Sequence, residues 1–170
     1  IKRGGADIVR WSNSNNLNPE WDDRAQQAAE MIPNDSIVLD LGCGAMSLES
    51  MLPKDCYYMP CDIAARDERT QDCDFNKGQY SESRNATLIT ILGVMEYLNN
   101  PQNFLEKIRE YSLPVIISYC IVELSKDWDR QSLGMKNHLT YECLMELIKQ
   151  ENFDVTKRHT VDSRQVLLRL

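Results

Sequence analysis

The chain has 170 residues, of which 42% are hydrophobic and 26% charged, and its formal net charge is −7. This length and composition predict one folded domain with a packed core. The negative charge argues against a nucleic-acid partner, because such surfaces usually carry a basic stripe, and no apolar run reaches the ~18 residues of a membrane span.

The N-terminal segment IKRGGAD has neither an initiator Met nor a signal-peptide pattern. The polar stretch WSNSNNLN that follows predicts a loop or arm. Pro19 then opens PEWDDRAQQAAEMI, whose acidic first turn and helix-forming residues predict a helix that ends near Pro33. Trp11 and Trp21 are candidate lids for a nearby pocket, although packing is the commoner role of tryptophan.

The next part of the chain alternates between strand and helix patterns. In chain order we expect a buried strand SIVLDL (36–41), a helix AMSLESML (45–52), a strand CYYMPCD (56–62) and a weaker strand RTQDCDF (69–75). The helix should end at Pro53. Because it directly follows two glycines, we expect its free N–H groups to face an anionic part of a ligand.

The remaining part continues the alternation and ends with two consecutive strands. We expect a strand ATLITILGV (86–94), a helix PQNFLEKIREYS (101–112), a strand PVIISYCIV (114–122), a polar connection (123–137), a helix YECLMELIKQE (141–151) capped by Thr140, and strands NFDVTKRHTV (152–161) and RQVLLRL (164–170). This order predicts an α/β sandwich around a mostly parallel sheet, with an antiparallel strand near its end.

The stretch VLDLGCGAMSLE joins the first strand to the expected helix. In an open parallel sheet, ligands bind beyond the carboxyl ends of the strands at the point where the strand order reverses. Gly42 and Gly44 permit a sharp turn there and let a ligand approach the backbone, because no Cβ intervenes. A tight turn without a ligand explains the same two glycines about equally well, so other residues must decide.

Two acidic residues favour a nucleotide-type ligand. Asp62 ends the second strand at a position where a carboxylate can accept hydrogen bonds from both hydroxyls of an adenosine ribose. Asp74 ends the third strand segment, where it can reach an adenine amino group with Phe75 beside the ring. A turn or capping aspartate is the alternative at both positions. Ser47 replaces the third glycine of a dinucleotide fingerprint, which weakens the hypothesis of a nicotinamide-dependent reductase. No Walker lysine follows the glycines, so a P-loop is not indicated.

The ordered motifs resemble those of the class I S-adenosylmethionine-dependent methyltransferases. VLDLGCG is similar to the first motif of that family, PCDI to its second-strand motif, CDFN to its adenine-side motif, ITILGVMEYLNNPQNFLEKI to its fourth-strand motif and NHLTYECLMELIKQENFDV to its late helix. The resemblance implies a Rossmann-like doubly wound sandwich with a seven-stranded sheet in the order 3-2-1-4-5-7-6 and strand 7 antiparallel. It also implies a single methyltransferase domain, 1–170, with an N-terminal arm and helix at 1–33 and a Rossmann-like core at 34–170.

The resemblance assigns binding roles to ten residues. It implies that Asp40, Gly42, Cys43 and Gly44 cradle the methionine end of S-adenosyl-L-methionine, that Asp62 binds the ribose, that Ile63, Asp74 and Phe75 face the adenine, and that Leu92 and Gly93 line the cofactor near its sulfonium. A sulfonium methyl group is already a strong electrophile. Alignment of the acceptor and exclusion of water are therefore the main requirements on the protein.

Two residues are candidates for catalysis. His138 lies in the polar connection after the fifth strand and can titrate near neutral pH, although bracing of the late helix is an alternative role. Glu96 follows the fourth strand, where a helix-start charge is an equally good explanation. An amine or carbon acceptor needs little further help, whereas a hydroxyl usually needs a base. Weaker candidates for the acceptor pocket are Tyr119, Asp127, Trp128 and Arg130.

Our leading hypothesis is therefore an enzyme that methylates a small-molecule or carbohydrate acceptor by in-line displacement. The alternative is a non-catalytic, cofactor-binding partner module of a methyltransferase complex. The six cysteines include no C-x-x-C pair and the two histidines lie far apart, so we expect no metal site. Free thiols in this number suggest a reducing, cytoplasmic setting. No feature of the sequence indicates an oligomeric state.

Overall fold

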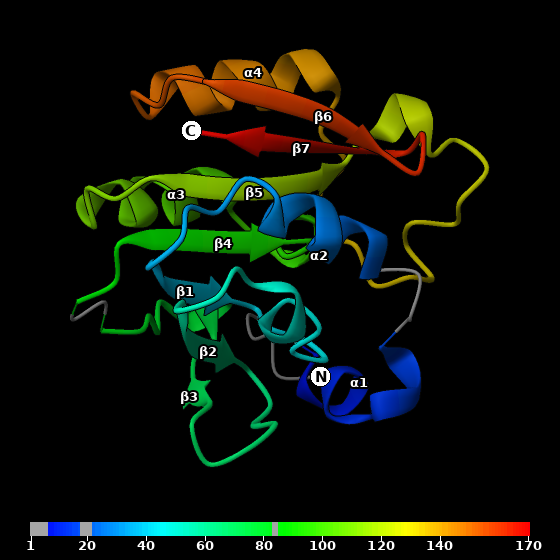
Figure 1. Cartoon of the computed structure of the whole chain (residues 1–170). Coiled ribbons are helices and arrows are strands. Elements are labelled where there is room, and N and C mark those ends of the chain that lie inside the picture. Colours follow the sequence, from blue (N-terminus) through cyan, green and yellow to red (C-terminus); the bar gives the residue numbers. More distant parts are fainter. Residues whose placement is uncertain (1–6, 18–21, 83–84) are drawn as a thin grey trace.

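The computed structural model describes residues 7–17, 22–82 and 85–170, which form three layers around a seven-stranded sheet (Figure 1). The strands are β1 (Ile37–Leu41), β2 (Tyr57–Asp62), β3 (Gln71–Asp72), β4 (Leu88–Leu92), β5 (Val115–Cys120), β6 (Lys157–Val161) and β7 (Gln165–Arg169). Their order is β3-β2-β1-β4-β5-β7-β6. The pairs from β3 to β5 are parallel, and β7 is antiparallel to both neighbours. The predicted sandwich and strand order are confirmed.

The α-helices of the described residues are α1 (Ile8–Ser12), α2 (Asp22–Ala29), α3 (Pro101–Glu110) and α4 (Tyr141–Gln150). Pro101 occupies the first turn of α3, where the side chain of Asn100 accepts a hydrogen bond from the backbone N–H of Asn103. The Thr140 hydroxyl accepts a hydrogen bond from the backbone N–H of Cys143 at the start of α4. The predicted helix starts at Pro101 and Thr140 are therefore confirmed.

Helices cover both faces of the sheet. Successive strand residues point to opposite sides, so one strand can contribute to two core clusters. Leu39 and Leu41 belong to the core cluster that also contains the apolar residues of α3 and α4. Val38 belongs to the cluster on the other side, with the buried alanines of α2. Figure 1 shows α2 in front of the sheet and α3 behind it. All residues of β4 and β5 are buried, as expected for strands covered on both faces.

The crossover between β1 and β2 differs from the prediction. In place of an α-helix at 45–52, it contains turns and one 3₁₀ turn, Glu49–Met51. Met46 has a φ of +60°, a left-handed conformation that interrupts an α-helix near its start, and Pro53 limits its other end. The segment between these residues is too short for a stable helix. The expectation that helix N–H groups face a ligand here is therefore wrong.

Three further segments are shorter or more ordered than predicted. The third strand shrinks from 69–75 to two residues, because Asp74 caps a 3₁₀ turn at Phe75–Lys77 and turns the chain away from the sheet. The sixth strand starts at 157 instead of 152, because Asn152 has a φ of +58°, a left-handed conformation that a strand does not contain. The arm contains α1. In the described part of the chain, no helix has both the length and the apolar character needed to span a membrane.

Most of the cysteines pack in the interior as free thiols. Cys43, Cys61, Cys73 and Cys120 are buried, whereas Cys56 is partly exposed and Cys143 is exposed. The prediction that most of these thiols serve as small core residues is confirmed.

Candidate functional site

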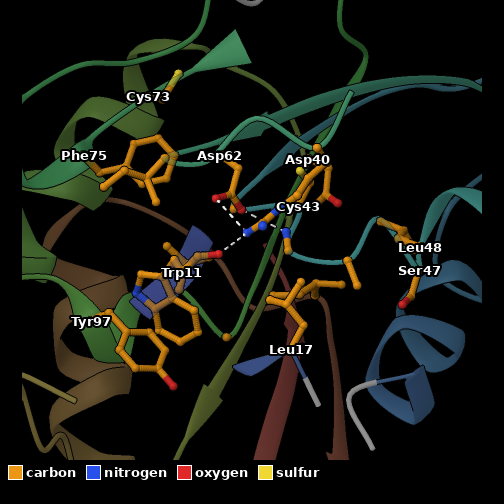
Figure 2. A pocket seen from close by; sticks show the side chains of 18 of the residues that line it. Trp11, Leu17, Asp40, Cys43, Ser47, Leu48, Asp62, Cys73, Phe75 and Tyr97 are labelled. Atoms are coloured by element: carbon orange, nitrogen blue, oxygen red, sulfur yellow. Dashed lines mark hydrogen bonds and ion pairs between the residues drawn. The ribbon is translucent and has the colours of Figure 1, made fainter. Parts of the chain in front are cut away.

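A pocket lies at the carboxyl ends of β1, β2 and β4 (Figure 2). All ten residues to which the sequence assigned a binding role line it: Asp40, Gly42, Cys43, Gly44, Asp62, Ile63, Asp74, Phe75, Leu92 and Gly93. They come from four separate segments of the chain. The parallel sheet brings them together because it places the ends of neighbouring strands at one edge. We call this the first pocket.

The glycine turn after β1 is fixed by the strand beside it. The backbone N–H groups of Gly42 and Cys43 both donate to the carbonyl oxygen of Cys61, at 2.7 and 3.0 Å. Gly42 has a φ of +85°, and a Cβ at this position would collide with the side chain of Val94. Both the conformation and the space therefore require glycine. The turn holds its backbone close to the first pocket for a structural reason that does not depend on a ligand.

Asp62 is buried and its carboxylate is held by backbone donors. Its Oδ2 accepts a hydrogen bond from the N–H of Gly44 at 2.9 Å, and its Oδ1 accepts one from the N–H of Ala64 at 3.0 Å. Arg66 Nη2 lies 3.5 Å from Oδ1 and also donates to the carbonyl oxygen of Trp11 at 2.9 Å. Arg66 thus links Asp62 at the end of β2 to the N-terminal segment. The sequence motifs did not indicate this link.

The indole of Trp11 lines the first pocket, as expected for a lid. It packs edge-on against the ring of Tyr97, with centroids 4.7 Å apart and an interplanar angle of 78° (Figure 2). Such aromatic pairs contribute about 0.5–1.5 kcal/mol beyond their burial. The lid role itself stays a prediction, and Trp21 lies outside the described residues.

Asp40 forms a buried polar floor in the first pocket. Its carboxylate accepts hydrogen bonds from the Tyr58 hydroxyl at 2.6 Å and from the Thr90 hydroxyl at 2.7 Å. Burial raises the pKa of Asp40 to about 6, although the two hydroxyls act in the opposite direction. Its protonation state therefore changes just below neutral pH.

The expected adenine side of the pocket is aromatic and carries a capping aspartate. Asp74 Oδ1 accepts a hydrogen bond from the N–H of Asn76 at 3.1 Å, and Oδ2 forms an ion pair with Lys77 at 2.9 Å. The capping role that the sequence left open is therefore present. The Phe75 ring lies 5.2 Å from that of Phe104 between centroids and belongs to the same wall.

Arg24 of α2 is a pocket residue that no motif indicated. Its guanidinium lies against Gly93, where a Cβ would collide with it, and Nη1 donates to Gln165 Oε1 at 2.9 Å. Desolvation lowers the pKa of Arg24, and the nearby carboxylates of Glu96 and Asp40 offset part of this effect. A helical arginine outside the strand ends has no sequence signal that separates it from a surface residue.

A second pocket, with a volume of about 430 Å³, adjoins the first. The two share Trp11, Arg24, Gly93 and Tyr97 as lining residues. Among the acceptor-side candidates, the second pocket is lined by Asp127 and Trp128 but not by Tyr119 or Arg130. Glu96 also lines it. The structure therefore places one catalytic candidate and two acceptor candidates in the pocket that Gly93 shares with the first.

His138 lies elsewhere and supports a buried arginine. Its Nδ1 accepts a hydrogen bond from Arg130 Nε at 3.1 Å. The Nη1 atom of Arg130 donates to the carbonyl oxygen of Cys120 and to the Ser125 hydroxyl, at 3.0 and 2.8 Å. His138 is absent from the lining of both pockets. This geometry supports a bracing role, and its role as a base stays a prediction.

The described ranges contain no group of three or more His, Cys, Asp or Glu side chains that could hold a metal ion.

No protein-family model matches the sequence, and no curated protein matches it. Solved structures match its fold. A SAM-dependent methyltransferase from Aquifex aeolicus is 11% identical with a TM-score of 0.68, covering 96% of this chain and 97% of that one. The N-methyltransferase NodS from Bradyrhizobium japonicum, in complex with S-adenosyl-L-homocysteine, is 15% identical with a TM-score of 0.66, covering 89% and 87%.

A third structure is the O-methyltransferase NcsB1 from neocarzinostatin biosynthesis, in complex with S-adenosylmethionine and 2-hydroxy-5-methyl naphthoic acid. It is 16% identical with a TM-score of 0.63, covering 84% of this chain and 51% of that one. The chain thus spans about half the length of NcsB1, and likewise 53% of the pyocyanin biosynthetic protein PhzM. At these identities the likeness shows the fold. The chain has the Rossmann-like fold of the class I methyltransferases, as the sequence resemblance implied.

Proposed function

We propose that the protein is an enzyme that transfers a methyl group from S-adenosyl-L-methionine to a small-molecule or carbohydrate acceptor by in-line displacement. One observation carries this proposal: ten residues selected from sequence motifs, in four separate segments, line a single pocket. The fold supports it, and so do the bound molecules of two structural neighbours. NodS binds S-adenosyl-L-homocysteine, and NcsB1 binds S-adenosylmethionine together with a naphthoic acid.

The lining of the first pocket fits the chemical groups of this cofactor. Asp62 offers acceptor oxygens for ribose hydroxyls. Ile63 and Phe75 offer an apolar surface for the adenine, and Arg24 offers a guanidinium for the methionine carboxylate. The cofactor supplies an electrophilic methyl group on a sulfonium. The chain's own residues then bind it, orient the acceptor and exclude water, which can together contribute several kcal/mol.

The second pocket supports an enzyme over a non-catalytic module. A catalyst needs a binding place for the acceptor next to the transferred group, whereas a module that only binds the cofactor needs none. The second pocket meets the first at Gly93, which the family resemblance places near the sulfonium.

Calorimetric titration with S-adenosyl-L-methionine and S-adenosyl-L-homocysteine tests the proposal. We expect micromolar binding to the unmodified protein and binding at least about tenfold weaker for Asp62→Ala. Asp72→Ala is the matched control, because Asp72 is the exposed register partner of Asp62 on β3 and does not line the pocket. Failure of the unmodified protein to bind either molecule, or binding of NAD in their place, would contradict the proposal.

A further inference from the structure

Glu96 lies in the 3₁₀ turn Met95–Tyr97, directly after β4, and has one oxygen without a donor. Its side chain is 2% exposed, and Oε1 accepts a hydrogen bond from the N–H of Cys120 at 2.6 Å. Oε2 is buried and has no hydrogen-bond partner. A buried oxygen left without a donor costs about 1–3 kcal/mol. A ligand that brings a donor to Oε2 would therefore complete the site.

The position of Glu96 indicates which ligand can do this. The residue lines the second pocket, and Gly93, where the two pockets meet, lies shortly before its turn in the chain. A group that donates a hydrogen bond to Oε2 therefore belongs to the methyl acceptor. This step rests on the proposed function, since it takes the first pocket as the cofactor site.

The bases available in the second pocket favour a nitrogen nucleophile. Among the described residues that line it there is no histidine and no lysine. Asp127 is exposed and paired with Arg164 at 3.2 Å, and Asp129 is exposed and accepts from the N–H of Ser132 at 3.1 Å. Glu96 remains as the buried base. Burial raises the pKa of Glu96, which makes it a stronger base, and a protonated amine gives up a proton far more readily than an alcohol does.

The walls of the second pocket indicate the body of the acceptor. The side chains of Trp11, Tyr97 and Trp128 line it, together with Leu133 and Met135. Charged and polar residues such as Arg10, Asp129 and Gln165 line the rest of it. Pockets of roughly 300–1,000 Å³ typically bind small organic molecules. The volume of about 430 Å³ is within this range. The three aromatic side chains offer ring faces and edges against which a flat apolar group can pack.

We propose that the acceptor is a small primary or secondary amine on an aromatic or apolar body, that its nitrogen donates to Glu96 Oε2, and that Glu96 takes the proton this nitrogen loses. An ammonium group first gives one proton to the Glu96 carboxylate. The nitrogen lone pair then forms the new N–C bond while the C–S bond breaks and its electron pair stays on sulfur. The positive charge moves from sulfur to nitrogen, and Glu96 returns its proton to solvent.

Ligand binding in the presence of saturating S-adenosyl-L-homocysteine tests this assignment. The probes are the amines phenethylamine and tryptamine and their alcohol counterparts 2-phenylethanol and tryptophol, followed by saturation-transfer NMR titration. We expect at least one amine to bind about tenfold or more tightly than its alcohol. Glu96→Gln should reduce this preference to about threefold or less. Glu110→Gln, which removes an exposed carboxylate that lines neither pocket, should retain it.

The outcomes separate this inference from the proposed function. If S-adenosyl-L-homocysteine does not bind, the proposed function fails. If it binds but no amine does, or if an alcohol binds as well as its amine, or if Glu96→Gln leaves the preference unchanged, the assignment of an amine to Glu96 is wrong. Because Glu96→Gln can fail to fold, the unmodified protein is also screened with isotope-labelled cofactor against the four probes. N-methylated products support the assignment, and exclusively O-methylated products overturn it.

Discussion

The two adjoining pockets are built from different kinds of structure. The first is formed mainly by the ends of β1, β2 and β4 and the turns that directly follow them. Much of the second is formed by α1 and the connection after β5, including Asp127, Trp128 and Asp129. The sheet register fixes the first set, so that residues far apart in sequence have defined neighbours. The second set depends on loop and helix-end contacts, where sequence changes cost less stability.

The largest effect is expected at the glycine turn of the first pocket. Gly42→Ala should lower the free energy of unfolding by about 2–5 kcal/mol, because a left-handed alanine costs roughly 1–2 kcal/mol and the collision with Val94 adds roughly 1–3 kcal/mol. Gly78→Ala is the control, since its φ is +72° but its Cβ would meet open space. It should show only the conformational cost. Equal urea-unfolding losses in the two variants would contradict the proposed rigidity of this turn.

The ionisation of Asp40 should make the stability of the protein depend on pH. Its pKa is raised in the folded protein to about 6, so folding favours the protonated form. The resulting penalty is absent below about pH 4 and fully present above about pH 6. One pKa unit corresponds to about 1.4 kcal/mol. The free energy of unfolding of Asp40→Asn, minus that of the unmodified protein, should therefore rise by roughly 3 kcal/mol from pH 3.5 to pH 7. A difference that does not change with pH would show that Asp40 is not the titrating group.

Trp11 should affect binding more than folding, because it belongs to the wall that both pockets share. Trp11→Ala removes the edge-on contact with Tyr97, worth about 0.5–1.5 kcal/mol. We expect the affinity for S-adenosyl-L-homocysteine to fall about three- to tenfold by calorimetry. Val9→Ala, in the same helix but exposed, should leave it unchanged. A large loss of thermal stability with intact affinity would instead assign Trp11 a packing role.

The smallest effect is expected at the rim of the second pocket. Asp127 and Arg164 form an exposed ion pair, and exposed pairs contribute about 0–1 kcal/mol. Asp127→Asn should therefore change the free energy of unfolding by less than about 0.5 kcal/mol, measured by urea titration at low and at high salt. A loss above about 2 kcal/mol would show that this rim is as rigid as the turn after β1.

The contrast between the pockets also explains what the sequence could predict. Strands such as β4 and β5 were predicted because they are long apolar runs, and α3 because Pro101 and an apolar face mark it. The ten predicted residues that line the first pocket follow from the family resemblance, whose short motifs lie at strand ends. The helix at 45–52 was predicted wrongly because the sequence contains no signal that Met46 adopts a φ of +60°.

The contributions of Arg24 and Arg66 could not be predicted because they arise from tertiary contacts alone. Arg24 reaches Gly93 from a helix on one face of the sheet, and Arg66 reaches the carbonyl of Trp11 from the loop after β2. Neither pair has a characteristic spacing. The sequence likewise favoured His138 as a base from its place in a polar connection, whereas the structure pairs it with Arg130.

The position of β7 has a consequence for synthesis on the ribosome. β7 lies between β5 and β6 although it follows both in the chain. The hairpin of β6 and β7 can form locally, but β5 keeps an unpaired edge until β7 emerges and docks against it. A nascent chain with a fully buried strand such as β5 and an open edge is prone to pair with other chains. The exposure of this edge therefore lasts as long as the chain between β5 and β7 takes to emerge from the ribosome.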